Sequence, residues 1–414
     1  MQKSTDARPI RRIVTGTDAR GRSIVLEDGP APNDHKNLGI SRYFTDLWVW
    51  HESPAPITGN ADDGDCAYDF PCPPDGGHLR IVEWPHRPPA FDPANDAEHV
   101  PEHATKIRPP GRTWDRGGNG AYSSAIHKTE TIDYGIVLTG ERILLLGERE
   151  LVMRPGDTIV QVAAWHQWKW IQPDTHGLMM FDFIAARWDN IGASKRPPAT
   201  AMPALPEGVK AARRIVIKDG IDGEDDYVLD APSHDVRTDP ARPGYAATRM
   251  WVTDATPAKL EFETLHLPHT LEPPVGGSVL RIVTFPPDSG WKNKVGRHEV
   301  RAYFEAMGSP AASQWSADAP HPYMQKTGSL DFGIVLEGEI VLILDTQEVA
   351  LKAGDVVIER GTRHAWSNRS GKPAVVAIAP HSANSLPSRR HCSWRSSGQA
   401  YKAHKPPTPK DRCA

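Results

Sequence analysis

The sequence predicts an all-β protein made of two tandem copies of one domain. Residues 127–166 align without a gap with residues 325–364, and 15 of these 40 positions are identical. The openings correspond as well, RRIVTG at 11–16 and RRIVIKDG at 213–220, so the spacing between the copies is nearly constant. Self-similarity at one fixed spacing is typical of a duplicated structural unit.

Each copy has the pattern of short strands joined by tight turns. DYGIVLTGERILLL contains two apolar runs separated by Thr139-Gly140, and ELVMRPGDTIVQV repeats that plan around Pro155-Gly156. The chain holds 39 Pro and 34 Gly, which suits many turns, and long helical periodicity is almost absent. The best helix candidate is the short segment Glu299–Met307. A β-sandwich or barrel is therefore expected for each copy.

The repeat also sets the expected domain limits. We expect the first copy at 1–190, a linker at 191–210 and the second copy at 211–381. Residues 382–414 are rich in Lys and Arg and have no apolar periodicity, so a disordered basic tail is expected there.

The composition indicates which binding partners and which cellular compartment are expected. The chain has 48 Lys and Arg against 52 Asp and Glu, and this balance excludes nucleic-acid binding through bulk positive charge. The sequence has no run of about 18 apolar residues, so a membrane span is not expected. The basic N-terminus lacks the apolar stretch of a secretory signal. Cys66 and Cys72 could pair, but two thiols in a reducing cytosol are the expectation. We therefore expect a cytoplasmic protein.

Four polar residues of the first copy could line one site. His127, Thr129 and Asp133 are separated by even numbers of residues, so on one strand they would share a face. His166 follows the second turn. Two imidazoles and one carboxylate form the facial triad, a ligand set that leaves metal coordination positions open. The alternative is that these are ordinary polar residues of a half-buried sheet.

The same residues resemble the two cupin motifs. The usual cupin pattern is HxH followed by a Glu, a Gly and then PxGxxH. Counting back from Gly140 places Asp133 in the Glu position and His127 in the first His position, while His166 falls at the last His. Thr129 stands where the second His would be. HKTETIDYGIVL and RGTRHAWSN are similar to stretches of small cupins from fungal aromatic-polyketide and bacterial catabolic clusters, which are usually described as cupin-type oxidoreductases.

The resemblance implies two tandem jelly-roll barrels and a divalent metal held by His127, Asp133 and His166. Fe(II) is the metal that the resemblance favours most, with Zn, Mn or Ni as the other candidates. The triad itself accepts several metals.

The second copy departs from this pattern at one ligand position. Gln325 stands where the first His should be, while Asp331 and His364 are kept. An amide oxygen is a poor ligand for a transition metal compared with imidazole, so we expect one bound metal rather than two. His321, four residues upstream, is a candidate replacement ligand in a secondary site.

Aromatic residues near these positions suggest a pocket for a flat apolar molecule, although such residues are equally at home in a core. The substrate-pocket candidates are Thr129, Tyr134, Trp168 and Trp366. Arg80 and Arg281 are aligned in the two copies within LRIV. Each could bind a substrate carboxylate or form a structural ion pair, and the sequence leaves both interpretations open.

Three functions fit these features. The first is an iron-dependent cupin oxidoreductase, such as a dioxygenase, acting on an aromatic or polyketide-like small molecule. The second is a non-redox lyase, decarboxylase or isomerase that uses Zn or Mn as a Lewis acid. The third is a bicupin that binds a small molecule without turnover. A homodimer is expected because jelly-roll edges often pair between subunits.

Overall fold

The computed structural model describes the chain in several segments. They are residues 9–35, 43–57, 59, 61–84, 106–108, 111–118, 123–147, 149–170, 176–220 and 225–384.

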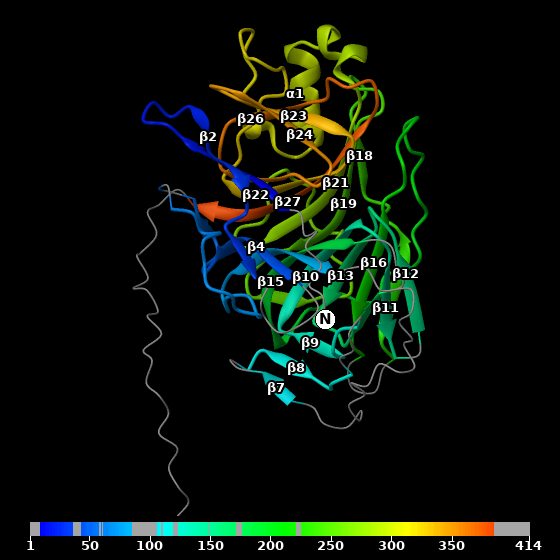
Figure 1. Ribbon diagram of the computed structural model, residues 1–414. Coiled ribbons are helices and arrows are strands. Elements are labelled where there is room, and N and C mark those ends of the chain that lie inside the picture. The colour runs from blue at the N-terminus through cyan, green and yellow to red at the C-terminus, as the bar shows by residue number, and fades with distance from the viewer. Residues whose placement is uncertain are drawn as a thin grey trace, which may run out of the picture.

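Two large sheets of nine strands each form the centre of the molecule (Figure 1). The first has the order β18 (Val236–Thr238), β19 (Ala246–Thr253), β21 (Ser278–Phe285), β27 (Ala374–Asn384), β22 (Ser329–Glu337), β25 (Val356–Arg360), β1 (Arg11–Thr17) and β2 (Ser23–Pro30), with β5 (Ala55–Pro56) beside β27. The second has the order β17 (Tyr227–Pro232), β16 (Arg213–Lys218), β13 (Thr158–Val162), β10 (Thr131–Thr139), β15 (Gly177–Ile191), β6 (Gly77–Trp84), β4 (Tyr43–Trp50) and β3 (Asn33–His35), with β20 (Ala258–Leu260) beside β15.

Small sheets of three strands accompany the large ones. They are β12 (Arg149–Met153), β11 (Arg142–Leu146) and β14 (Gln167–Trp170); β24 (Glu348–Lys352), β23 (Glu339–Leu344) and β26 (His364–Ser367); and β7 (Lys106–Arg108), β8 (Thr113–Asp115) and β9 (His127–Thr129). Each of the first two packs its apolar side chains with those of one large sheet, which makes two barrels. We call the barrel containing β10 the first barrel and the one containing β22 the second barrel. The all-β prediction is confirmed.

Helices are few in the described part of the chain. Helix α1 (Arg297–Ala306) covers one side of the second barrel and confirms the short helix predicted here. Its first turn is held by the Gly296 amide, which donates to the Glu299 carboxylate. Three 3₁₀ turns lie nearby, at Asp288–Gly290, Lys292–Lys294 and Pro310–Ala312. No helix among the described residues is long and apolar enough to cross a membrane.

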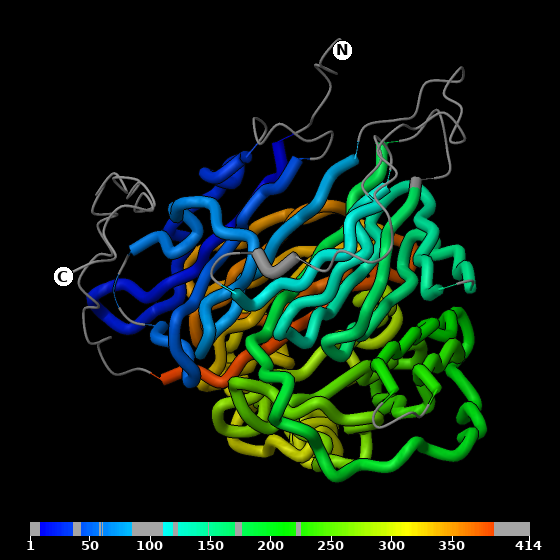
Figure 2. The backbone as a smooth tube through the Cα atoms, turned by 90° about the horizontal axis from the view of Figure 1, so that it is seen from below, coloured from blue at the N-terminus to red at the C-terminus, as the bar shows by residue number. Residues whose placement is uncertain are grey.

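The two copies exchange their opening strands. Strand β1, from the start of the chain, lies parallel to β25 of the second barrel, and β16 lies parallel to β13 of the first. Ile13 is therefore buried in the core of the second barrel, and its repeat counterpart Ile215 is buried in the first. Figures 1 and 2 show the blue N-terminal strands beside the orange strands of the second copy. The barrels consequently do not coincide with the sequence copies 1–190 and 211–381.

A shared core joins the two large sheets. Strand alternation sends Ile132, Tyr134 and Ile136 of β10 to the same buried cluster as Leu330 and Phe332 of β22. The neighbouring positions on these strands point into the barrels instead. Each large sheet therefore buries both faces, one against its own small sheet and one against the other barrel.

The described residues cover the predicted linker and the start of the predicted tail. Strand β27 continues to Asn384, so residues 382–384 of the predicted tail belong to a strand. The rest of the tail, 385–414, lies outside the described residues. The linker predicted at 191–210 begins at the end of β15 and is without strand or helix beyond Ile191.

The swapped strands predict that a substitution in one sequence copy changes amide hydrogen exchange in the barrel of the other copy. Ile13→Ala should lower the free energy of unfolding by about 2–5 kcal/mol, because it opens a cavity in a packed core. The faster amide exchange should appear in β25, on the second barrel, although Ile13 belongs to the first copy. Ile215→Ala is the matched variant and should act on β13. Faster exchange confined to β13 in the Ile13 variant would contradict the exchange of strands.

Candidate functional site

Two histidines of the first barrel lie against each other. The backbones of His127 and His166 form a bridge, and their ring centroids are 4.4 Å apart. The Nδ1 atoms are 2.8 and 2.9 Å from the carbonyl oxygens of Ala125 and Ala164. Such a carbonyl orients an imidazole so that Nε2 faces the site, as in many metal-binding histidines. Burial lowers the pKa of His166 to about 4, so this ring is neutral at pH 7.

Asp133 does not join the two histidines. The expectation of one continuous strand from His127 to Asp133 is wrong, because β9 ends at Thr129 and β10, in another sheet, begins at Thr131. The even spacing therefore does not place these side chains on one wall. Burial, and then the nearby Asp182 carboxylate, raise the pKa of Asp133 to about 8.

The metal predicted for the first barrel lacks a complete ligand set. Within the described segments, no group of three His, Cys, Asp or Glu side chains is placed to hold a metal ion. His127 and His166 supply two imidazoles, and the carboxylate of the expected triad is elsewhere. The side chains present thus do not fit a facial triad.

The other pocket candidates of the first copy, Thr129, Tyr134 and Trp168, are buried. The Thr129 hydroxyl is buried and hydrogen bonded to Thr131 at 2.6 Å. Tyr134 points to the opposite side of β10, where its hydroxyl lies 2.8 Å from Ser278 Oγ in the core between the barrels. Trp168 is packed in the core of the first barrel, near His166. Tyr134 therefore cannot line a pocket inside the first barrel.

The interiors of the two barrels differ in the size of corresponding side chains. On β15, Met179, Phe181 and Phe183 face Val137, Gly135 and Asp133 of β10. The equivalent residues of β27, opposite β22, are Val376, Ile378 and Pro380. Large side chains fill this wall in the first barrel, and smaller ones leave space in the second.

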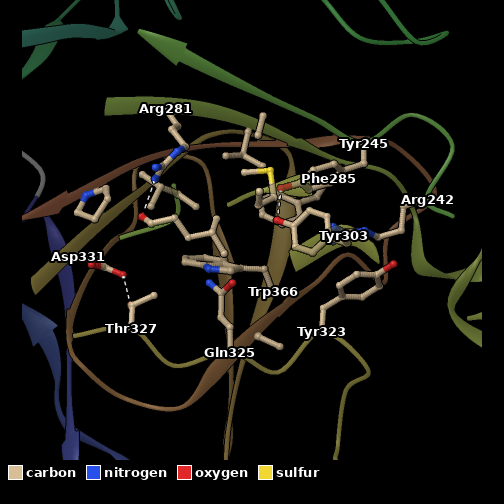
Figure 3. A pocket seen from close by; sticks show the side chains of 17 residues that line it. Arg242, Tyr245, Arg281, Phe285, Tyr303, Tyr323, Gln325, Thr327, Asp331 and Trp366 are labelled. Carbon is tan, nitrogen blue, oxygen red and sulfur yellow. Dashed lines mark hydrogen bonds between the residues drawn. The ribbon is translucent and has the colours of Figure 1, made fainter. Parts of the chain in front are cut away.

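That space is a cavity in the second barrel (Figure 3). In the view shown, Arg281, Asp331 and Thr327 lie on one side, Tyr303, Tyr323 and Arg242 on the other, and Trp366 between them. The lining residues are Arg242, Tyr245, Ala247, Leu271, Arg281, Val283, Phe285, Tyr303, Met307, Tyr323, Gln325, Thr327, Asp331, Ala365, Trp366, Ile378 and Pro380.

Polar groups collect behind one wall of this cavity. The side-chain nitrogen of Gln325 is 3.0 Å from His364 Nε2, and Glu359 lies 2.5 Å from His364 Nδ1. Burial alone would lower the pKa of His364, but the Glu359 carboxylate outweighs it and raises that pKa to about 9. Burial, and then Glu359, raise the pKa of Asp331 to about 6. A protonated imidazole has no lone pair for a metal.

The candidate replacement ligand of the second copy lies apart from this cluster. His321 is buried beside Trp291, with Nε2 3.7 Å from the Asp288 carboxylate. It is not among the residues that line the cavity. The structure therefore brings Gln325, Asp331 and His364 together and leaves His321 out.

Sequence reasoning missed several residues of this site. Glu359 faces Asp331 across β25 and β22, and its repeat counterpart is the uncharged Gln161. Tyr303 comes from helix α1, which no strand pattern would place against a barrel. The one available signal was a charged residue, Glu359, at an inward position of an apolar strand.

The buried Asp133 makes a prediction about stability and pH. An unfolded Asp titrates near 3.9. A folded-state pKa near 8 means that the folded protein binds the proton more tightly, so stability falls as pH rises from about 4 to 8. Asp133→Asn should remove this loss and raise the melting temperature at about pH 8.5 by several degrees, with little change near pH 4.5.

A matched control distinguishes this effect from loss of a needed charge. Asp182 is paired with His381 at 2.9 Å, so Asp182→Asn should lower the melting temperature at pH 7. Circular dichroism melts at several pH values measure both variants. If Asp133→Asn were destabilising at about pH 8.5, the ionised carboxylate would have a partner and the assignment would be wrong.

Comparisons with known proteins give short but specific matches. The chain is 56% identical over 48 residues to the phomopsin biosynthesis cluster protein D of Diaporthe leptostromiformis, which is 11% of this chain and 25% of that protein. It is 47% identical over 49 residues to the cupin-domain-containing oxidoreductase virC of Hypocrea virens, 12% and 25% of the two chains. It is 25% identical over 161 residues to the cupin-domain-containing oxidoreductase fogC of Aspergillus ruber, 38% and 62%. The chain thus spans about a quarter of the length of the first two relatives.

Among solved structures, the fold is similar to AerE from Microcystis aeruginosa, with 10% identity and a TM-score of 0.36 over 85% of this chain and 97% of that one. A variant of the Bacillus subtilis oxalate decarboxylase OxdC has 11% identity and a TM-score of 0.36 over 86% and 76%.

The family signature falls on the second barrel. The cupin domain family matches residues 318–379, which span β22 to β27 and contain Gln325, Asp331 and His364. The first barrel repeats the same strand plan through the internal duplication. The chain therefore consists of two tandem barrels of the cupin fold and resembles the cupin-domain oxidoreductases.

Proposed function

We propose that this bicupin is an oxidoreductase of the cupin type and that its substrate, an aromatic or polyketide-like small molecule, binds in the second barrel. The observation that carries the proposal is the cavity itself, which lies inside the barrel and combines aromatic walls with a small set of polar groups. The names of virC and fogC, both cupin-domain-containing oxidoreductases, support the reaction class.

The aromatic walls suit a flat ring. Five aromatic side chains line the cavity, those of Tyr245, Phe285, Tyr303, Tyr323 and Trp366, and the Trp366 ring lies against Gly333 of β22. A Cβ on Gly333 would approach the Trp366 ring to 2.9 Å, closer than real Cβ contacts, so the glycine lets the indole lie against the strand. Aromatic side chains bind a flat ligand through large contact areas at low entropic cost.

The polar wall supplies groups that bind and move a proton. The Thr327 hydroxyl is 3.5 Å from Asp331 Oδ2, and Asp331 Oδ1 is buried without a hydrogen-bond partner. An unpartnered carboxyl oxygen in a cavity is placed to accept or donate a proton when a ligand hydroxyl approaches. The Gln325 amide, beside His364, can orient the same ligand by hydrogen bonding.

Metal dependence belongs to the proposal only as an implication of the cupin resemblance. Bound Fe(II) would supply one-electron and dioxygen chemistry, and Zn, Mn or Ni would act as a Lewis acid. The described side chains do not complete a ligand set for such a metal.

A second candidate function is supported by the polar cluster. Asp331, Glu359 and His364 are three interacting titratable groups at one wall, an arrangement that suits proton transfer in an isomerase or lyase. Two probes separate the candidates. Oxygen uptake with catechol supports the oxidoreductase, while deuterium incorporation from D₂O into resorcinol under argon, with no oxygen uptake in air, supports proton transfer. Asp331→Asn should reduce whichever activity is found.

The location of the substrate site is tested by a pair of tryptophan variants. Trp366→Leu should weaken binding of benzamide, a neutral single-ring probe, by about 5-fold, because aromatic pairs contribute about 1 kcal/mol beyond buried area. Trp168→Leu, the corresponding change in the first barrel, should leave the affinity unchanged. Isothermal titration calorimetry measures both. Equal loss in the two variants, or loss only with Trp168→Leu, would place the site elsewhere.

A further inference from the structure

The two barrels carry opposite charges at one pair of corresponding positions. In the first barrel, Asp46 on β4 lies opposite Arg80 on β6. In the second, Arg249 on β19 lies opposite Arg281 on β21. Both of these outer strands have a bulge directly after this position, so the local backbone is the same. Asp46 and Arg249 therefore occupy equivalent backbone positions and differ in the sign of their charge.

In the first barrel the arginine is fully compensated. Arg80 Nε and Nη2 donate to the two carboxylate oxygens of Asp46 at 2.6 and 3.0 Å. The remaining donors reach the carbonyl oxygens of Asp69 and Phe70 at 2.7 and 3.3 Å. Burial alone would raise the pKa of Asp46, but the Arg80 guanidinium holds that pKa below its ordinary value. This pair is a closed structural ion pair.

In the second barrel the corresponding arginine, Arg281, has no paired carboxylate. Arg281 donates to the carbonyl oxygens of Thr270 and Leu271, the counterparts of Asp69 and Phe70. Its Nε, which in Arg80 binds the aspartate, is buried and has no hydrogen-bond partner. Within the described segments, no carboxylate oxygen lies within 4 Å of this guanidinium.

The neighbouring charges do not supply a substitute. Arg249 pairs with Asp235, and Arg242 at the far side pairs with Asp239. Asp331 also lines the cavity and acts on Arg281 only through space. Burial and the positive charge of Arg249 lower the pKa of Arg281 to about 10, so it remains charged at pH 7.

A buried cation without a paired anion is costly to a fold. Arg281 is 3% exposed and lines the cavity, where the polar wall meets the aromatic residues (Figure 3). A carboxylate bound in the cavity would receive the Nε–H and a second guanidinium donor of Arg281, as the Asp46 carboxylate receives those of Arg80 in the first barrel.

From this buried arginine without a paired carboxylate we infer that the ligand of the second barrel is an aromatic acid whose carboxylate is bound by Arg281. The inference rests on the proposed function, because it assumes that an aromatic molecule occupies this cavity. It adds the charge of the ligand and the residue that recognises it.

Benzoate and benzamide form a matched pair of probes, since they have the same ring and nearly the same shape but differ in charge. The full-length chain should bind benzoate about 10- to 100-fold more tightly than benzamide at pH 7, as expected for charge-assisted hydrogen bonds. Isothermal titration calorimetry gives both affinities. If benzamide binds as well as benzoate, the inference fails while the proposed site stands. If neither probe binds, both fail.

Variants of the two arginines assign the preference to one residue. Arg281→Met should abolish the preference for benzoate and leave benzamide binding within about 3-fold, whereas Arg281→Lys should keep part of the preference. Arg80→Met is the control in the first barrel and should leave the ratio of the two affinities unchanged. A benzoate preference that survives in folded Arg281→Met, or that is lost in Arg80→Met, would overturn the assignment to Arg281.

Discussion

The parallel pairings β1–β25 and β13–β16 are the contacts on which the rest of this structure depends. Each adds a strand from one sequence copy to the large sheet of the other. Strand pairing satisfies backbone donors and acceptors that would otherwise be exposed at a sheet edge. Because each barrel needs a strand from the other copy, neither copy contains the whole of its own barrel. The fixed placement of the two large sheets follows from this exchange.

The face-to-face packing of those sheets then determines which side chains of each strand can line a barrel interior. One set of alternate residues enters the shared core, and the other set enters a barrel interior. Tyr134 and Phe332 are used for contact between the barrels, so the aromatic groups that form the cavity come from other elements. Tyr303 from helix α1 and Trp366 from β26 supply them in the second barrel.

The duplicated frame has diverged in volume and in charge. Met179, Phe181 and Phe183 occupy a wall in the first barrel that smaller residues form in the second. The charged positions differ as well, since Asp46 and Arg80 of the first barrel correspond to Arg249 and Arg281 of the second. A closed ion pair such as Asp46 and Arg80 favours stability, whereas open volume with an unpaired cation favours binding of a ligand.

The sequence alone determined the strand content, the duplication and the cupin resemblance. These follow from local features, namely the spacing of apolar residues, turns at Gly and Pro, and repeated motifs. It could not determine that the second barrel contains a cavity, because cavity volume depends on residues that meet across strands distant in sequence, such as Gly333 and Trp366. It suggested a facial triad from even spacing, but a break after Thr129 placed His127 and Asp133 in different sheets. The exchange of strands and the lost partner of Arg281 were likewise decided by tertiary structure, since both depend on which strands pair.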